Sequence, residues 1–355
     1  MQLTQILRFA VKHGISDIHF KVGKSPLFRK NGQLVSQPGA PVVTPDQLKH
    51  WYQQVTNSLV QGRYEQDREA DTAHAVPGIG RFRINVFQQR SHMGMVFRHI
   101  PEKVKSIRDL QLPPQLENIA QYPRGLVLVT GATGSGKSTT LAAMLEHINR
   151  VKPVHVLTIE DPIEFVFTDQ QAVFNQRQVG VDTHSFPAAL RSALRQDPDI
   201  ILIGELRDLE TIEVAMQAAE TGHLVFSTLH TVDAMETISR IIGMFPGAMQ
   251  TQVRLQLSTI LRAVISQRLV RTTDDKRAAA CEILVNTDYI RDLMADPART
   301  HEIVEAMQVG QASYGSQTFD QSLIKLVQDN RITLQEALAN ATNPATIKMH
   351  AEGFT

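Results

Sequence analysis

The segment Gly131-Ala-Thr-Gly-Ser-Gly-Lys-Ser138 constrains this chain most, because it matches the phosphate-binding pattern G-x-x-x-x-G-K-[ST]. A continuous apolar run ends at Thr130 before it, and an Ala/Leu-rich helix is expected from Thr139. Glycines let the backbone curl so that successive N–H groups face phosphate oxygens, and the helix N-terminus adds partial positive charge. A chance glycine turn is the alternative, but a chance turn would not explain both flanking elements. The loop therefore predicts nucleotide binding, with ATP and Mg²⁺ as the ligands.

The residues expected to contact the nucleotide come from the loop and the first helical turn. They are Gly131, Thr133, Gly134, Ser135, Gly136, Lys137, Ser138 and Thr139. The ammonium of Lys137 is expected to reach the β- and γ-phosphates, and the hydroxyl of Ser138 to bind Mg²⁺ directly.

From Gly125 onward, short uninterrupted apolar runs alternate with helical segments. The runs are Leu126–Val129, Val154–Ile159, Ile200–Ile203 and Leu224–Phe226. Strands that are buried on both faces have this composition, as in a parallel sheet between helix layers. Toward the end of the chain, Val253–Leu269 predicts an amphipathic helix, and Phe319–Val327 and Leu334–Ala339 predict smaller helices. The pattern indicates an α/β fold.

The first hundred residues predict a smaller α/β module. Ser16–Val22 and Leu27–Val35 are strand candidates, and the second contains the hairpin signal Asn31-Gly32. In Arg81–Gln88 apolar and polar residues alternate, which predicts a strand with one polar face that carries Arg83. Gly94–Ile100, with Arg98, is the expected neighbouring strand. We therefore predict an N-terminal domain over 1–100, a proline-rich linker over 101–123 and the nucleotide-binding domain over 124–355.

Hydrolysis also requires groups that position water and the metal ion. Glu160, Asp161 and Glu164 follow a predicted strand, so they are expected at the carboxyl edge of the sheet. A solvated acidic loop is the alternative for these three acids.

Two further strand ends carry candidates. Glu205 follows the apolar run that ends at Ile203; contact with a metal-bound water is favoured over a plain surface acid because a phosphate loop is present. His230 follows the run that starts at Leu224 and is the candidate sensor of the γ-phosphate. His223 is expected to be structural, since most histidines are satisfied polar groups.

Composition excludes several classes of protein. Lys plus Arg equals Asp plus Glu at 36 each, so no net positive charge favours nucleic acid. A single cysteine, Cys281, excludes an internal disulfide framework and a four-thiolate zinc site. No apolar run approaches the ~20 residues of a membrane helix. We expect a cytoplasmic protein that does not insert into a membrane and reaches one only through partners.

Four segments, in this order, resemble the secretion ATPase superfamily of type II secretion and type IV pili. The family names are Walker A for the phosphate loop, Asp box for the acids from Glu160 to Glu164, Walker B for the strand end with Glu205 and His box for the strand end with His230. The chain is most similar to PilT-type retraction ATPases. The likeness extends over nearly the whole chain, and it is carried by Ser16-Asp-Ile-His19, Arg81-Phe-Arg-Ile-Asn85, Pro123-Arg-Gly-Leu-Val-Leu-Val-Thr-Gly131 and Ala219-Glu-Thr-Gly-His223. Assembly-type relatives carry a four-cysteine zinc site and longer N-terminal regions, and we expect neither in this protein.

The resemblance implies a PAS-like N-terminal domain, a RecA-like C-terminal domain and a homohexamer that powers pilus retraction and twitching motility. It implies an inner-membrane platform protein and other pilus-machine components as partners. Glu164 is similar to the general base, and Glu205 to the residue that holds Mg²⁺ through water. Arg83 and Arg98 resemble arginines that close onto the γ-phosphate, within one chain or between chains; plain surface charge is the alternative.

One segment departs from the family pattern. Retraction ATPases typically carry Ala-Ile-Arg-Asn-Leu-Ile-Arg, whereas this chain reads Tyr289-Ile-Arg-Asp-Leu-Met-Ala295. A helix that buries Ile290, Leu293 and Met294 would explain the segment without any partner. The departure keeps open an accessory or regulatory nucleotide-binding ring, and a DNA translocase on the same core is the third class of function.

Overall fold

The computed structural model describes residues 2–30, 33–36, 39–100 and 104–352. Its internal contacts divide the chain into two compact units. The first unit comprises Met1–Val104 with two later segments, Glu160–Val166 and Gln176–Ser185, and the second comprises the rest. These units are defined by contacts, and the domain boundaries drawn from the sequence at 100 and 123 stay a prediction.

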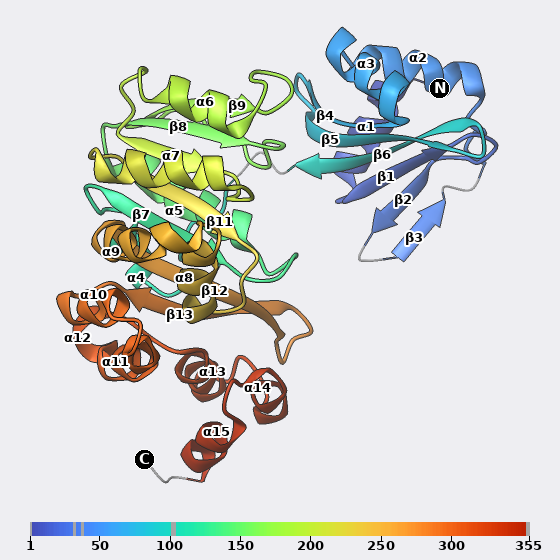
Figure 1. Cartoon of the computed structure of the whole chain (residues 1–355). Coiled ribbons are helices and arrows are strands. Elements are labelled where there is room, and N and C mark those ends of the chain that lie inside the picture. The colour runs from blue at the N-terminus through green and yellow to red at the C-terminus, as the bar shows by residue number, and fades with distance from the viewer. Residues whose placement is uncertain (1, 31–32, 37–38, 101–103, 353–355) are drawn as a thin grey trace. The chain divides into compact units, whose positions relative to one another are not determined.

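The first unit is built on an antiparallel six-stranded sheet of order β3-β2-β1-β6-β5-β4 (Figure 1). Its strands are β1 Asp17–Lys21, β2 Leu27–Lys30, β3 Gln33–Ser36, β4 Glu69–Val76, β5 Gly80–Gln89 and β6 His92–Ile100. The predicted hairpin is confirmed as the antiparallel pair β2–β3, while its predicted turn, Asn31-Gly32, lies outside the described residues. Alternation leaves one face of the sheet apolar and the other polar.

Three helices contribute side chains to the core on the apolar face of this sheet, the third through the partly buried Tyr64. They are α1 Leu3–Lys12, α2 Pro45–Val55 and α3 Ser58–Asp67. Thr44 starts α2 with a capping box, in which its hydroxyl accepts a hydrogen bond from the Gln47 backbone N–H at 3.2 Å. The core contains Trp51 of α2 and the strand side chains Ile18, Phe20, Phe82, Ile84, Met95 and Phe97. The opposite, polar face of the sheet therefore carries Asp17, His19, Arg83 and Arg98.

The second unit contains a seven-stranded sheet of order β13-β12-β7-β11-β10-β8-β9. Its strands are β7 Gly125–Thr130, β8 His155–Glu160, β9 Val173–Gln178, β10 Ile200–Ile203, β11 Leu224–Leu229, β12 Leu261–Arg271 and β13 Arg277–Val285. The neighbours β12-β7-β11-β10-β8 are all parallel, and β13 pairs antiparallel with β12. The predicted parallel sheet is confirmed, and every residue of β7, β10 and β11 is buried.

Helices connect these strands and then form a helical end to the chain (Figure 1). The connecting helices are α4 Gln115–Ile119, α5 Lys137–Val151, α6 Phe186–Ala193, α7 Leu209–Glu220, α8 Ala234–Gly243, η1 Gly247–Met249 and α9 Gln250–Ile260. The terminal ones are α10 Asp288–Ala295, η2 Thr300–Glu302, α11 Ile303–Val309, α12 Gln311–Tyr314, α13 Phe319–Gln328, α14 Leu334–Asn340 and α15 Pro344–Ala351. The predicted helices near 319–327 and 334–339 are confirmed as α13 and α14.

The single helix predicted over Val253–Leu269 is wrong. Helix α9 ends at Ile260, and Leu261 begins β12, which inserts between β7 and β13. The apolar residues of this stretch fit helical spacing, but β12 has neighbours on both sides and is buried over most of its length. Partners far away in the sequence therefore override the local pattern.

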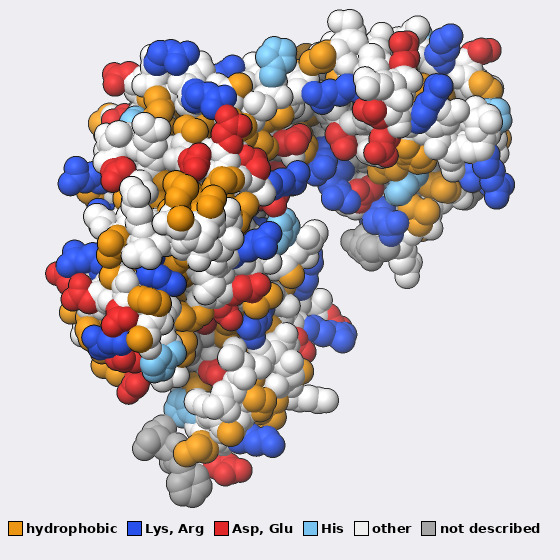
Figure 2. Space-filling model, in the orientation of Figure 1, with side chains coloured by type: hydrophobic (Ala, Val, Ile, Leu, Met, Phe, Trp, Pro, Cys, Tyr) orange, Lys and Arg blue, Asp and Glu red, His pale blue; other side chains and the backbone are white. Residues whose placement is uncertain are grey.

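Charges of both signs are mixed on the face of the molecule shown in Figure 2, in keeping with the balance of the whole sequence. Among the described residues, no helix combines the length and apolar character needed to cross a membrane.

Candidate functional site

The phosphate loop leaves β7 at Gly131, as the sequence predicted, and enters α5 at Lys137, two residues before the helix start expected at Thr139. Gly131 has φ +140°, and a Cβ there would lie 2.5 Å from the carbonyl oxygen of Gln267 in β12. Gly136 caps α5 in the left-handed region, at φ +94°. A side chain at Gly131 would collide with backbone, and at Gly136 it would be strained, so both positions require glycine.

The polar groups of the loop fit a phosphate. Lys137 is 8% exposed, and its Nζ donates hydrogen bonds to the carbonyl oxygens of Gly131 at 2.7 Å and Ala132 at 3.1 Å. The hydroxyl of Ser135 is buried and has no hydrogen-bond partner among the residues that the structure describes. A buried donor without a partner is costly, so it is well placed to donate to an incoming anion. The loop and neighbouring residues of β12 line a cavity of about 330 Å³.

The candidate from the Walker B segment and the candidate from the His box lie together at the same edge of the sheet. Because β7, β11 and β10 are parallel neighbours, Gly131, His230 and Glu205 all follow adjacent strand ends. The Nε2 of His230 lies 3.1 Å from Oε1 of Glu205. The hydroxyl of Thr228 donates to the carbonyl oxygen of Gly204 at 2.7 Å, which ties the two strand ends together.

Arg207 is part of this cluster and was missed by the sequence reasoning. Its Nε donates to Oε2 of Glu205 at 2.8 Å, so both oxygens of that carboxylate are engaged. The side chain of Glu205 is 19% exposed, and Arg207 is 62% exposed. A basic residue two positions after the strand-end acid was the available signal, but a loop arginine is common enough to pass unnoticed.

Arg83 and Glu164 lie near each other within the first unit. Nη1 of Arg83 lies 3.9 Å from Oε1 of Glu164, and its Nε lies 4.0 Å from Asp71. These are long, partly exposed contacts that cost little to exchange for others. Glu160, at the end of β8, is 9% exposed and accepts a hydrogen bond from the backbone N–H of Glu164 at 3.4 Å.

Arg98 is held more tightly than Arg83. Its Nε donates to Oδ1 of Asp17 at 2.8 Å, from the neighbouring strand. Burial by itself would raise the pKa of Asp17, but hydrogen bonds from Arg98 and Ser16 outweigh burial and lower it. Asp17 is therefore a charged group at neutral pH, although it is almost wholly enclosed.

His223 fits the structural role predicted for it. Its Nδ1 lies 3.0 Å from the carbonyl oxygen of Ala218, near the end of α7. A ring nitrogen in this position satisfies one of the carbonyls that a helix leaves open at its C-terminus.

The residues present fit a Mg²⁺ ion that is held mainly by phosphate. Within the described part of the chain, no group of three or more His, Cys, Asp or Glu side chains is arranged to hold a metal. Mg²⁺ in nucleotide sites typically takes one or two protein ligands, with phosphate oxygens and waters completing the shell. The exposed hydroxyl of Ser138, at the start of α5, and the carboxylate of Glu205 are suitable for that purpose.

A buried carboxylate lies under the helix that follows His230. Oε1 of Glu282, in β13, accepts a hydrogen bond from the backbone N–H of Ala234, the first residue of α8, at 2.8 Å. Burial raises the pKa of Glu282 to about 7, against the opposing effect of that hydrogen bond.

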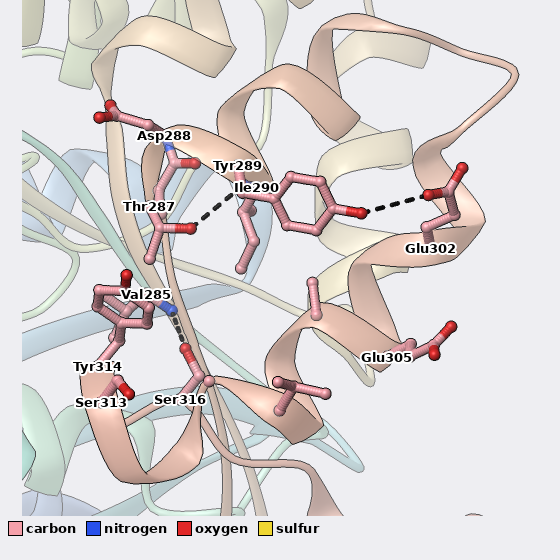
Figure 3. Close-up of a pocket in the computed structure, with 14 residues that line it drawn as sticks. Val285, Thr287, Asp288, Tyr289, Ile290, Glu302, Glu305, Ser313, Tyr314 and Ser316 are labelled. Atoms are coloured by element: carbon pink, nitrogen blue, oxygen red, sulfur yellow. Dashed lines mark hydrogen bonds between the residues drawn. The ribbon is translucent and has the colours of Figure 1, made fainter.

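A separate pocket of about 910 Å³ lies among α10, α11 and α12 (Figure 3). Tyr289 reaches across it, and its hydroxyl donates to the carboxylate of Glu302 at 3.5 Å. The prediction that the segment from Tyr289 to Ala295 forms a helix with Ile290, Leu293 and Met294 inward is confirmed. The lining residues, all within 285–316, include none of the phosphate loop, so this pocket is separate from the nucleotide cavity.

Comparisons with known proteins find similarity over nearly the whole chain. The family model described as "Type II/IV secretion system protein" matches residues 1–350. The "Type IV pilus retractation ATPase PilT" of Pseudomonas aeruginosa is 45% identical over 344 residues, which cover 97% of this chain and 99% of that protein. A "Twitching motility protein" of Neisseria gonorrhoeae is 45% identical over 320 residues, 90% of this chain and 85% of that one. The crystal structure of the pilus retraction motor PilT with bound ADP superposes with a TM-score of 0.90 at 41% identity, covering 98% and 99% of the two chains.

Proposed function

The chain belongs to the type II/IV secretion system protein family, and on that premise we propose that it is an ATP-hydrolysing motor that drives retraction of a type IV pilus. The observation that carries the proposal is the 45% identity over 97% of the chain to a protein named as a pilus retractation ATPase. The phosphate loop gives it a chemical basis, because that loop is complete in sequence and in geometry.

The phosphate loop would bind the phosphates of ATP. Backbone N–H groups between Gly131 and Lys137, together with the hydroxyl of Ser135, would donate to phosphate oxygens. The ammonium of Lys137 would exchange its two carbonyl partners for the β- and γ-phosphates. When bound beside Ser138 and Glu205, Mg²⁺ would neutralise charge on the phosphates.

The two acids have different surroundings, and this suggests different roles. Both oxygens of Glu205 already accept hydrogen bonds or lie within 3.1 Å of a ring nitrogen, which suits a fixed anchor for metal-bound water. Glu164 has a side chain that is 45% exposed and a loose ion pair at 3.9 Å, which suits a group that must accept a proton from water. We therefore assign Glu164 as general base and Glu205 as the anchor, with His230 sensing the γ-phosphate through Glu205.

Arg83 and Arg98 would supply positive charge to the γ-phosphate from the first unit. Their pairing with phosphate would strengthen while ATP is present and vanish when phosphate leaves, which couples the chemical state to domain motion. In a homohexamer, the domain motions of the six subunits would combine to produce the pulling force. An inner-membrane platform protein and other pilus components would receive the force and hold the otherwise cytoplasmic ring at the membrane.

The alternative role as an accessory or regulatory ring has a specific basis in α10. This helix keeps the buried side chains of the family segment, but Asp292 and Ala295 replace the expected asparagine and second arginine. In that role the chain would bind ATP and depend on a sister motor for movement.

Two measurements test the proposal. The purified chain should hydrolyse ATP in a Mg²⁺-dependent manner without added DNA, and deleting its gene should give hyperpiliated cells that do not twitch. Cells without pili would indicate assembly instead, and unchanged pili would indicate the accessory role. An ATPase rate that rises with DNA and falls with salt would support a translocase.

A further inference from the structure

The polar face of the first sheet contains a carboxylate that the sequence motifs left without a role. The side chain of Asp17 is 7% exposed although it points away from the apolar core. Its Oδ1 accepts a hydrogen bond from Nε of Arg98, and its Oδ2 accepts one from the hydroxyl of Ser16, both at 2.8 Å. Both carboxylate oxygens are therefore engaged.

The side chain of Arg98 is arranged differently, because it is 66% exposed. Residues 17 and 98 face each other in the register of β1 and β6, so the contact is set by the sheet itself. Among the contacts of the described residues, Arg98 uses only its Nε, and neither Nη has a partner. Asp17 thus fixes the inner end of the guanidinium and leaves its outer edge available for an anion.

A second arginine lies beside this edge. Arg83 of β5 is the register partner of Arg98 on β6, so two positive side chains occupy the same face of adjacent strands. Like charges directly opposite each other destabilise a sheet. The only contacts seen on Arg83 in the described structure are the loose pairs with Asp71 and Glu164. An anion shared by both guanidinium groups would relieve this repulsion.

We infer that Asp17 is a positioning residue for the reaction, which holds Arg98 by its Nε so that both Nη groups are presented to the terminal phosphate of ATP. This inference rests on the proposed function. The competing explanation is a structural ion pair that stabilises the sheet and does not affect the phosphate. The two explanations differ in whether the effect of Asp17 passes through Arg98.

A double-mutant cycle separates them in the full-length chain. Asp17→Asn keeps the shape and one acceptor but removes the charge, and it should lower kcat for ATP about 10-fold, because a small misplacement of a catalytic group is costly. In an Arg98→Ala background, Asp17→Asn should change kcat by less than about twofold, since its target is gone. The matched control is Glu117→Gln, which alters a similar arginine–carboxylate pair with Arg108 at 3.0 Å and should leave kcat unchanged.

A binding measurement makes the test independent of turnover. The ratio of the dissociation constants for ADP and ATPγS, measured by calorimetry, reports contacts to the terminal phosphate. Asp17→Asn should lower this preference for the triphosphate about 10-fold in the wild-type background and leave it unchanged in Arg98→Ala. Equal effects of Asp17→Asn in both backgrounds, or a lower Tm with an unchanged ratio, would overturn the inference. A wild-type chain that binds ATP without hydrolysing it would instead refute the proposed function, and the ratio would still test Asp17.

Discussion

The two candidate regions of this molecule differ in how firmly their polar groups are held. At the edge of the parallel sheet, Lys137 and Glu205 make hydrogen bonds of 2.7 to 3.1 Å, and backbone geometry fixes the loop. On the polar face of the first sheet, Asp17 holds Arg98 at 2.8 Å, but the neighbouring Arg83 makes ion pairs of 3.9 and 4.0 Å. The first arrangement suits a preorganised phosphate site, and the second suits groups that exchange partners during a cycle.

The largest expected effect comes from removing the ammonium group of Lys137 from the phosphate loop. Lys137→Ala should reduce ATP turnover by ~10³-fold or more, because no other group of the loop replaces an ammonium at the β- and γ-phosphates. Steady-state phosphate release by the purified variant measures this. Lys348→Ala, in the last helix, is the matched control. Substantial turnover by Lys137→Ala would show that the loop is not the catalytic phosphate site.

Glutamine variants of the two acids sharpen the assignment of roles. Glu164→Gln should reduce kcat by ~10²- to 10⁴-fold, as expected for the loss of a general base, while the dissociation constant for ATP stays nearly constant. Glu205→Gln should also slow turnover severely, and its deficit should respond to Mg²⁺ concentration. Normal turnover in both variants would remove these assignments.

The loose contacts of Arg83 predict a separation between activity and stability. Arg83→Ala should lower kcat by ~10- to 100-fold if Arg83 meets the γ-phosphate, yet cost less than ~1 kcal/mol of unfolding free energy. Parallel ATPase and thermal-unfolding measurements check this. A loss of stability with full activity would mean that Arg83 is a structural surface charge.

The last prediction concerns stability rather than turnover, at Glu282, the buried carboxylate of β13 that accepts the Ala234 N–H. A carboxyl whose folded pKa is about 7 binds its proton more tightly in the folded state than in the unfolded one. Its stabilising contribution is thus present below its ordinary pKa and is lost as pH rises toward 7 and above. Glu282→Gln should therefore raise unfolding free energy by about 1–3 kcal/mol at pH 8, with a difference that shrinks toward pH 5. An equal difference at both pH values would contradict the burial effect.

Local patterns predicted much of the fold because local chemistry controls it. Four continuous apolar runs predicted β7, β8, β10 and β11. The prediction of one helix over Val253–Leu269 was wrong because the segment from Leu261 onward forms a strand that pairs with β7 and β13. The spacing of apolar residues is a local property, so it does not show whether a segment pairs with strands that are distant in the sequence.

The candidate site divides in the same way. The eight contiguous residues of the phosphate loop determine a binding geometry by themselves, since glycine conformations and a helix N-terminus are properties of the local backbone. The contact of Arg207 with Glu205 is local as well, because the two residues are two positions apart, whereas the contact of Asp17 with Arg98 was decided only by tertiary structure. Asp17 and Arg98 are 81 residues apart in the chain and meet because β1 and β6 pair in one register. Such contacts depend on the entropy and packing of the whole sheet, which a short motif does not encode.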